Sequence, residues 1–89
     1  MTFFFRKDYL KVYISTDILN LHYRVEMREP TDLMFRKVVY FHLFDNVLDA
    51  IGHKLILEQL EKESIDMLIC KQNPTKKDRT DIIRKTIRQ

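Results

Sequence analysis

Glycine is nearly absent from this sequence, because the 89 residues contain only Gly52. A loop that cradles a phosphate needs several glycines, since its backbone must reach positive φ values and come close to the ligand. Neither G-x-G-x-x-G nor G-x-x-x-x-G-K-[S/T] can be written on the chain. The glycine-rich nucleotide-binding motifs are therefore excluded. Gly52 itself lies in an apolar, helix-like run rather than in a turn.

Cysteine, tryptophan and histidine are also scarce, with one, none and three residues respectively. The single cysteine, Cys70, excludes an intramolecular disulfide and any C-x-x-C zinc motif, and it favours a reducing compartment. The histidines share no metal-ligand spacing, and no apolar run nears the roughly 20 residues that span a bilayer. We expect a soluble, cytoplasmic protein that binds no membrane, metal, cofactor or small-molecule substrate.

The residues that carry chemistry also fail to form a catalytic pattern. Cys70 with a histidine could act as a nucleophile and its base, but it lies in a short apolar run and is better interpreted as a packing residue. Asp49 and His53 are four residues apart, which an ion pair on a helix surface explains more simply than acid–base catalysis. We expect no enzymatic activity.

What the chain does contain fits a folded globule: 45% of the residues are hydrophobic and 33% are charged. Its length predicts one domain over residues 1–89, with a thin stability margin because small domains bury less of their surface. Basic charge is concentrated at the end. Residues 74–89 hold six basic and two acidic residues, whereas the rest of the chain holds ten basic and eleven acidic ones.

A β-hairpin from about Tyr9 to Met27 is the clearest structural pattern. Both arms alternate between apolar and polar residues, as a half-buried antiparallel pair requires. A turn around residues 16–17 predicts that Ile14 faces Leu19 and Val12 faces Leu21, which places every apolar residue on one face. This register also places a polar face outward. Thr16-Asp17 lacks the chemistry of the preferred two-residue turn, which favours a four-residue loop.

The middle of the chain allows two interpretations. Apolar residues recur at helical spacings through Phe41, Phe44, Leu48, Ile51 and Leu55, which favours an amphipathic helix over residues 31–63, either continuous or broken near residues 45–46. The composition of residues 37–44 is instead typical of a strand, and a third strand there would leave a helix only from residue 46. If the segment is helical, its apolar residues cannot all face one small core. We therefore expect a homo-oligomer, most simply a two-fold dimer.

Two further elements are expected after residue 63. Residues 65–70 are predicted to form a short buried strand. The pattern Thr75-x-x-Asp78 predicts the start of a basic helix that ends near residue 88. The sequence thus predicts an α+β fold with an N-terminal antiparallel β-hairpin, a central amphipathic helix, a short further strand and a C-terminal basic helix.

Two basic surfaces are candidates for binding. The outer face of the predicted hairpin combines tyrosines with basic residues, a pattern typical of single-stranded nucleic-acid binding, of protein contacts and of ordinary solvated sheet faces. The last helix adds a basic face that could meet phosphates or an acidic protein. The candidate residues are Tyr9, Lys11, Tyr13, His22, Arg24, Lys77, Arg84, Lys85 and Arg88.

The preferred interpretation is a small, non-enzymatic interaction or regulatory protein that binds another protein or itself. The alternative is a nucleic-acid-binding module that uses the tyrosine–basic sheet face and the C-terminal helix. Salt dependence separates the two, because phosphate contacts release counterions.

Overall fold

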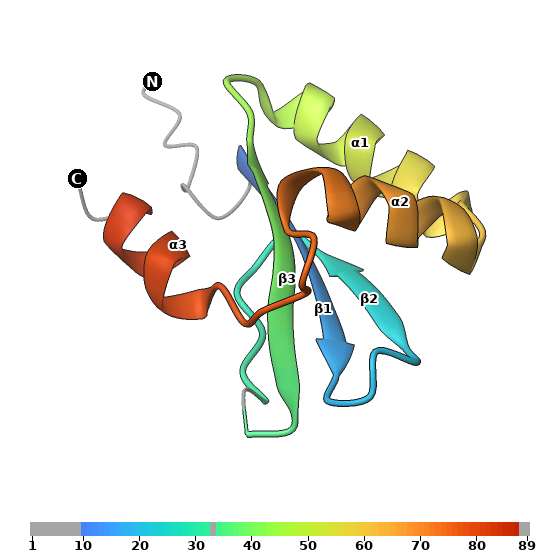
Figure 1. The fold of residues 1–89 in the computed structure, drawn as a ribbon. Coiled ribbons are helices and arrows are strands. Elements are labelled where there is room, and N and C mark those ends of the chain that lie inside the picture. Colours follow the sequence, from blue (N-terminus) through green and yellow to red (C-terminus); the bar gives the residue numbers. More distant parts are fainter. Residues whose placement is uncertain (1–9, 33, 88–89) are drawn as a thin grey trace.

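The fold is α+β, as the sequence predicts, and it consists of a three-stranded antiparallel sheet with three helices (Figure 1). The computed structural model describes residues 10–32 and 34–87. The strands are β1 (Lys11–Asp17), β2 (Tyr23–Glu26) and β3 (Arg36–Leu43), in the order β2-β1-β3. The helices are α1 (Val47–Gln59), α2 (Lys62–Gln72) and α3 (Thr80–Ile87). None of the described helices is long and apolar enough to cross a membrane.

Strand β1 is buried on both faces because it lies between two strands and between two layers of helix. Val12 and Ile14 join the larger apolar cluster, which Ala50 and Leu57 of α1 and two isoleucines of α2 complete. Tyr13 points to the other face and packs with Val38, Phe41 and Ile83, the last from α3. Helices α1 and α2 therefore cover one face, and α3 lies against the other (Figure 1).

The hairpin register predicted from the sequence is wrong by six residues, although its alternation is correct. Ile14 pairs with Val25 rather than with Leu19, and residues 18–22 form a loop instead of a strand. The carboxylate of Asp17 accepts hydrogen bonds from the backbone N–H groups of Leu21 and His22, and Asn20 adopts a φ of 59°. Asp17 thus nucleates a longer turn than two residues could make. A shift by an even number of residues preserves the faces.

The strand interpretation of residues 37–44 is confirmed, and the long helix over residues 31–63 is wrong. Strand β3 contains a register irregularity opposite Ile14 and Ser15 of β1. It sends both Val39 and Tyr40 to the larger cluster while Val38 and Phe41 pack on the opposite face. Such a bulge breaks the alternation that normally identifies a strand.

Local side-chain contacts explain where the helices form. Asn46 caps α1, and its side chain accepts a hydrogen bond from the N–H group of Leu48. The predicted strand at residues 65–70 is instead part of α2, where Ile65 and Ile69 are buried one turn apart. Helix α3 begins at Thr80, later than the predicted Thr75 cap. Here the carboxylate of Asp78 accepts hydrogen bonds from the backbone N–H and the hydroxyl of Thr80.

Candidate interaction surface

The tyrosines and basic residues predicted to share an open sheet face do not form one. Lys11 and Tyr13 are only 5% and 3% exposed, and Ile83 of α3 packs on Tyr13, on the face of β1 that the hairpin alone would leave open. His22 lies in the exposed loop before β2. Arg24 is exposed, and its guanidinium pairs with Asp32 at 2.8 Å. Tyr9 lies outside the described residues.

The basic C-terminal segment is exposed in part. Lys77 and Lys85 are exposed, and Arg84 donates a hydrogen bond at 2.7 Å to the carboxylate of Glu29. That ion pair fixes α3 to the segment after β2 and lowers the free positive charge of the helix. Arg88 lies outside the described residues.

Cys70 and His53, two of the groups considered for catalysis, lie on different helices. Cys70 is exposed on α2, so its predicted packing in a buried strand is wrong. The Nε2 atom of His53 lies 3.1 Å from the hydroxyl of Tyr40, and its ring lies near the rings of His42 and Phe44, tilted relative to both. Burial, followed by the nearby His42, lowers the pKa of His53. Among the described residues, no group of three or more histidine, cysteine, aspartate and glutamate side chains could hold a metal ion.

Asp66 on α2 connects β2, which is distant in the sequence, with the turn before α3. Its carboxylate accepts hydrogen bonds from the hydroxyl of Tyr23 on β2, from Lys76 Nζ at 2.8 Å and from Lys62 Nζ at 3.5 Å. The Lys76 ammonium, followed by the Tyr23 hydroxyl, lowers the pKa of Asp66 to about 2. Both lysines also lie within 6 Å of the Tyr23 ring centre, at 5.7 and 5.6 Å. The cluster fixes β2 to α2 and to the turn before α3.

The outward face of α1 is apolar and uncovered within the described residues. It carries four large side chains that are 39–72% exposed: Leu48, Ile51, Leu55 and Ile56. The sequence places three of them in a stripe that was expected to face the core. The residues of α1 that enter the core are instead Ala50 and Leu57. In an α-helix, residues 48, 52 and 55 fall on one face, which places Gly52 within this apolar surface.

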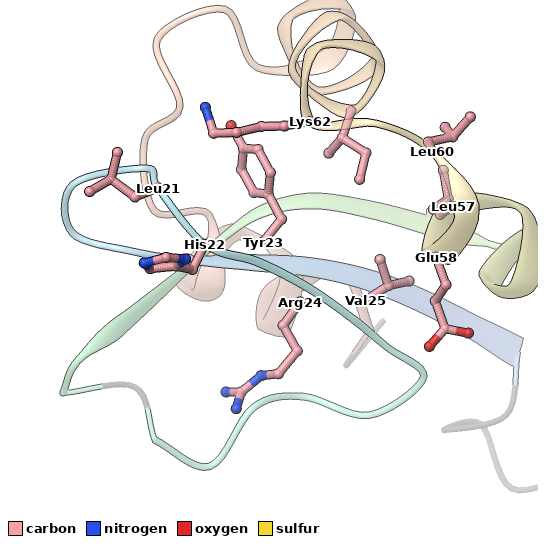
Figure 2. Close-up of a pocket in the computed structure, with 10 residues that line it drawn as sticks. Leu21, His22, Tyr23, Arg24, Val25, Leu57, Glu58, Leu60 and Lys62 are labelled. Carbon is pink, nitrogen blue, oxygen red and sulfur yellow. The ribbon is translucent and has the colours of Figure 1, made fainter.

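A groove lies between β2 and the junction of α1 with α2, with a volume of about 490 Å³ (Figure 2). Figure 2 shows Tyr23 and Val25 pointing towards the helices and Arg24 pointing away from them. Leu57, Leu60 and Ile65 contribute apolar lining from the helices. A second hollow of about 660 Å³ continues past the end of β2, where residues 24–32 and Lys54 line it.

Sequence reasoning found neither the groove nor the α1 surface. The groove lies beside β2, and the predicted register misplaces the pairing of this strand by six residues. The α1 surface lies outward because His53 and Leu57, not Leu48 and Leu55, turn towards the sheet. The signal that could have revealed it is Gly52, an isolated glycine within a helical pattern.

Comparison with protein-family models, with curated proteins and with solved structures gives no match for this chain.

Proposed function

We propose that this protein acts by binding protein rather than by catalysis, and that its partner is a second copy of the same chain. The observation that carries the proposal is the exposed apolar face of α1. Its four large side chains, Leu48, Ile51, Leu55 and Ile56, lie on one helix next to a groove. A contiguous apolar patch on a small domain is typical of an interaction site. A helix that is apolar on several sides needs cover on several sides.

Gly52 supports contact with another backbone at this face. A glycine inside a helix costs about 0.5–1 kcal/mol relative to alanine. Nothing lies within 4 Å of the position that a Cβ at Gly52 would occupy, and its φ is not positive. The protomer therefore gains nothing from the absence of a side chain here. A helix from another molecule that crosses over Gly52 would gain a closer approach.

The structural reason to propose self-association differs from the reason that the sequence suggested, which was the apolar segment before α1. Four apolar residues of β3 pack on its two covered faces: Val39 and Tyr40 on one, Val38 and Phe41 on the other. These four need no second copy to cover them, whereas Leu43 at the end of the strand is 53% exposed. One element later, α1 carries four large exposed apolar side chains on one helix.

Leu55→Glu is expected to weaken self-association at least about tenfold, because it places a charge on the apolar contact and each tenfold corresponds to about 1.4 kcal/mol. Leu55 is 52% exposed, so the substitution should leave the fold intact. Met67→Glu is the matched control, because Met67 is a 66% exposed apolar residue on α2. Sedimentation velocity over a concentration series measures both. Equal weakening by the two variants would show that the α1 face is not the contact.

Gly52→Ala is expected to have opposite effects on folding and on association. It should raise the free energy of unfolding of the monomer by about 0.5–1 kcal/mol, because alanine favours the helix and the new methyl group meets open space. It should weaken self-association, because the methyl group enters the space that a second helix would use. Denaturant melts at low protein concentration measure the stability of the monomer, and sedimentation at high protein concentration measures its self-association. Unchanged association would place the contact away from Gly52.

Nucleic-acid binding stays a prediction, with less support than the sequence suggested. Its sheet component required Lys11 and Tyr13 on an open face, and both are buried. The remaining support is the exposed Lys77 and Lys85 near or on α3. Fluorescence anisotropy with labelled single-stranded RNA at low and moderate salt tests it, since phosphate contacts give a steep salt dependence.

A further inference from the structure

The two edge strands of the sheet differ in whether another segment hydrogen-bonds to their outer backbone groups. Strands β2 and β3 are the edge strands, because β1 lies between them. The segment from Gln72 to Arg79 runs along the outer edge of β3 and occupies its backbone groups. In the part of the chain that the structure describes, no strand lies beside the outer edge of β2.

Four residues of the connecting segment act on β3 as a neighbouring strand would. The side-chain amide of Gln72 accepts from the N–H of Phe41 at 3.0 Å and donates to its carbonyl at 2.8 Å. Asn73 donates to the carbonyl of Val39 at 3.1 Å. The remaining two contacts involve Val38: its N–H donates to Asp78, and its carbonyl accepts from the N–H of Arg79 at 2.8 Å. An exposed edge is a template for pairing with another chain, and this cover blocks it.

A groove lies beside β2, whereas a hydrogen-bonding segment lies along the outer edge of β3. The groove of about 490 Å³ lies between β2 and the α1–α2 junction, and Leu57, Leu60 and Ile65 line its helix side (Figure 2). An extended segment that added to β2 would send alternate side chains towards the helices. Recognition by strand addition works in this way: backbone hydrogen bonds give affinity and pockets for alternate side chains give specificity.

We propose that the occupant of this edge is β2 of a second copy, added antiparallel about a two-fold axis at Val25. This inference rests on the self-association proposed above and names a contact at the edge of the sheet, on the Lys54–Glu58 side of α1 rather than on its exposed apolar face. The pairing would join the two sheets into one sheet of six strands. An axis of this kind is perpendicular to the sheet, so the α1 and α2 helices of both copies would remain on the same face.

The charges of β2 are complementary to themselves in this register. With Val25 opposite Val25, Arg24 of each copy lies opposite Glu26 of the other, and the axis generates this pair twice. Arg24 and Glu26 already attract each other within one protomer, where Arg24 Nε lies 3.1 Å from Glu26 Oε1. Both side chains are accessible for a further contact, at 42% and 31% exposure. Opposite charges directly across two strands stabilise their pairing, and like charges oppose it.

The apolar residues of β2 fit the same arrangement. Tyr23 and Val25 point towards the helices, so in the second copy they would approach the groove beside Leu57 and Leu60 (Figure 2). The flank of α1 above this edge carries Lys54 and Glu58, which form an ion pair at 3.1 Å. The two-fold axis sets the two α1 helices antiparallel and turns these oppositely charged flanks towards each other.

Charge reversal tests the register directly. Arg24→Glu places two acidic residues opposite two acidic residues in the paired strands, and Glu26→Arg places basic residues opposite basic ones. Each variant alone is expected to dissociate at least about tenfold more readily than the wild-type chain, because both symmetry-related attractions become repulsions. An equimolar mixture of the two variants restores complementarity at both positions. We expect the mixture to associate within about threefold of the wild-type constant.

Sedimentation velocity of the wild-type chain, each variant and the mixture provides the measurement, and circular dichroism confirms that each variant is folded. Lys85→Glu on α3 is the control, because it changes the net charge as Arg24→Glu does at an exposed position. A monomeric wild-type chain would overturn both this inference and the proposed self-association. A wild-type dimer that both reversals leave intact would overturn the register alone. Two monomeric variants that fail to associate when mixed would overturn it as well.

Discussion

Val12→Asp and Tyr13→Asp should both unfold the protein, whereas Leu21→Asp should leave its stability within about 0.5 kcal/mol of the wild-type value. Val12 is fully buried among the helices α1 and α2, and Tyr13 is 3% exposed on the side of α3. A buried, unpaired carboxylate costs more than about 4 kcal/mol, a large part of the roughly 5–10 kcal/mol that stabilises a domain of this size. Leu21 is 52% exposed in the loop before β2.

Denaturant melts of the three variants test the position of β1 at the centre of the fold. Tolerance of Tyr13→Asp would contradict burial of β1 on both faces. A Leu21→Asp variant as unstable as Val12→Asp would favour the short hairpin that the sequence predicts, in which Leu21 faces Val12.

Asp66→Asn should lower the free energy of unfolding by about 1–3 kcal/mol, because the carboxylate accepts hydrogen bonds from two ammonium groups and a tyrosine hydroxyl. The loss should depend on pH. The pKa of Asp66 is about 2 in the folded chain against an ordinary 3.8, so its stabilisation is complete above about pH 4 and disappears as the pH falls through 2. The wild-type chain should therefore lose its advantage over Asp66→Asn between these values.

Urea melts of both proteins from pH 6 to pH 2 measure this difference. The exposed Asp45 provides a matched control, since Asp45→Asn removes a carboxylate for which the structure gives no hydrogen bond or ion pair. Tyr23→Phe should cost less than Asp66→Asn, and the double variant should cost less than the sum of the two, because the residues share one hydrogen bond. A constant difference between wild type and Asp66→Asn across the pH range would contradict the assigned role of the carboxylate.

The sequence predicts correctly those features that depend on local periodicity. The alternation in both arms of the hairpin assigns Val12, Ile14 and Val25 to one face, and the structure confirms it. The register depends on the length of the turn, and residues 16–22 contain no glycine or proline that would specify one. The hydrogen bonds from Leu21 and His22 to Asp17 form only when the longer loop closes, so the sequence pattern could not show them.

The remaining errors arise where tertiary structure overrides a short pattern. Residues 65–70 contain an apolar run that suits a strand as well as a buried helix, and its length does not distinguish them. Lys11 alternates as an exposed residue should, yet it is 5% exposed in β1, where it pairs with Leu43 of β3. Tyr13 of the candidate binding face is buried for the same reason, because Ile83 of α3 packs on it. An arm of a hairpin has a free face only when nothing distant in the sequence packs on it.

We assign both the exposed α1 face and the outer edge of β2 to contact with a second copy of the chain. Sedimentation equilibrium of the wild-type protein, from low to high micromolar concentration, tests this claim most directly. The account predicts an average mass that rises with concentration towards twice the 10.9 kDa of the chain. A mass that remains at 10.9 kDa over the whole range would contradict it.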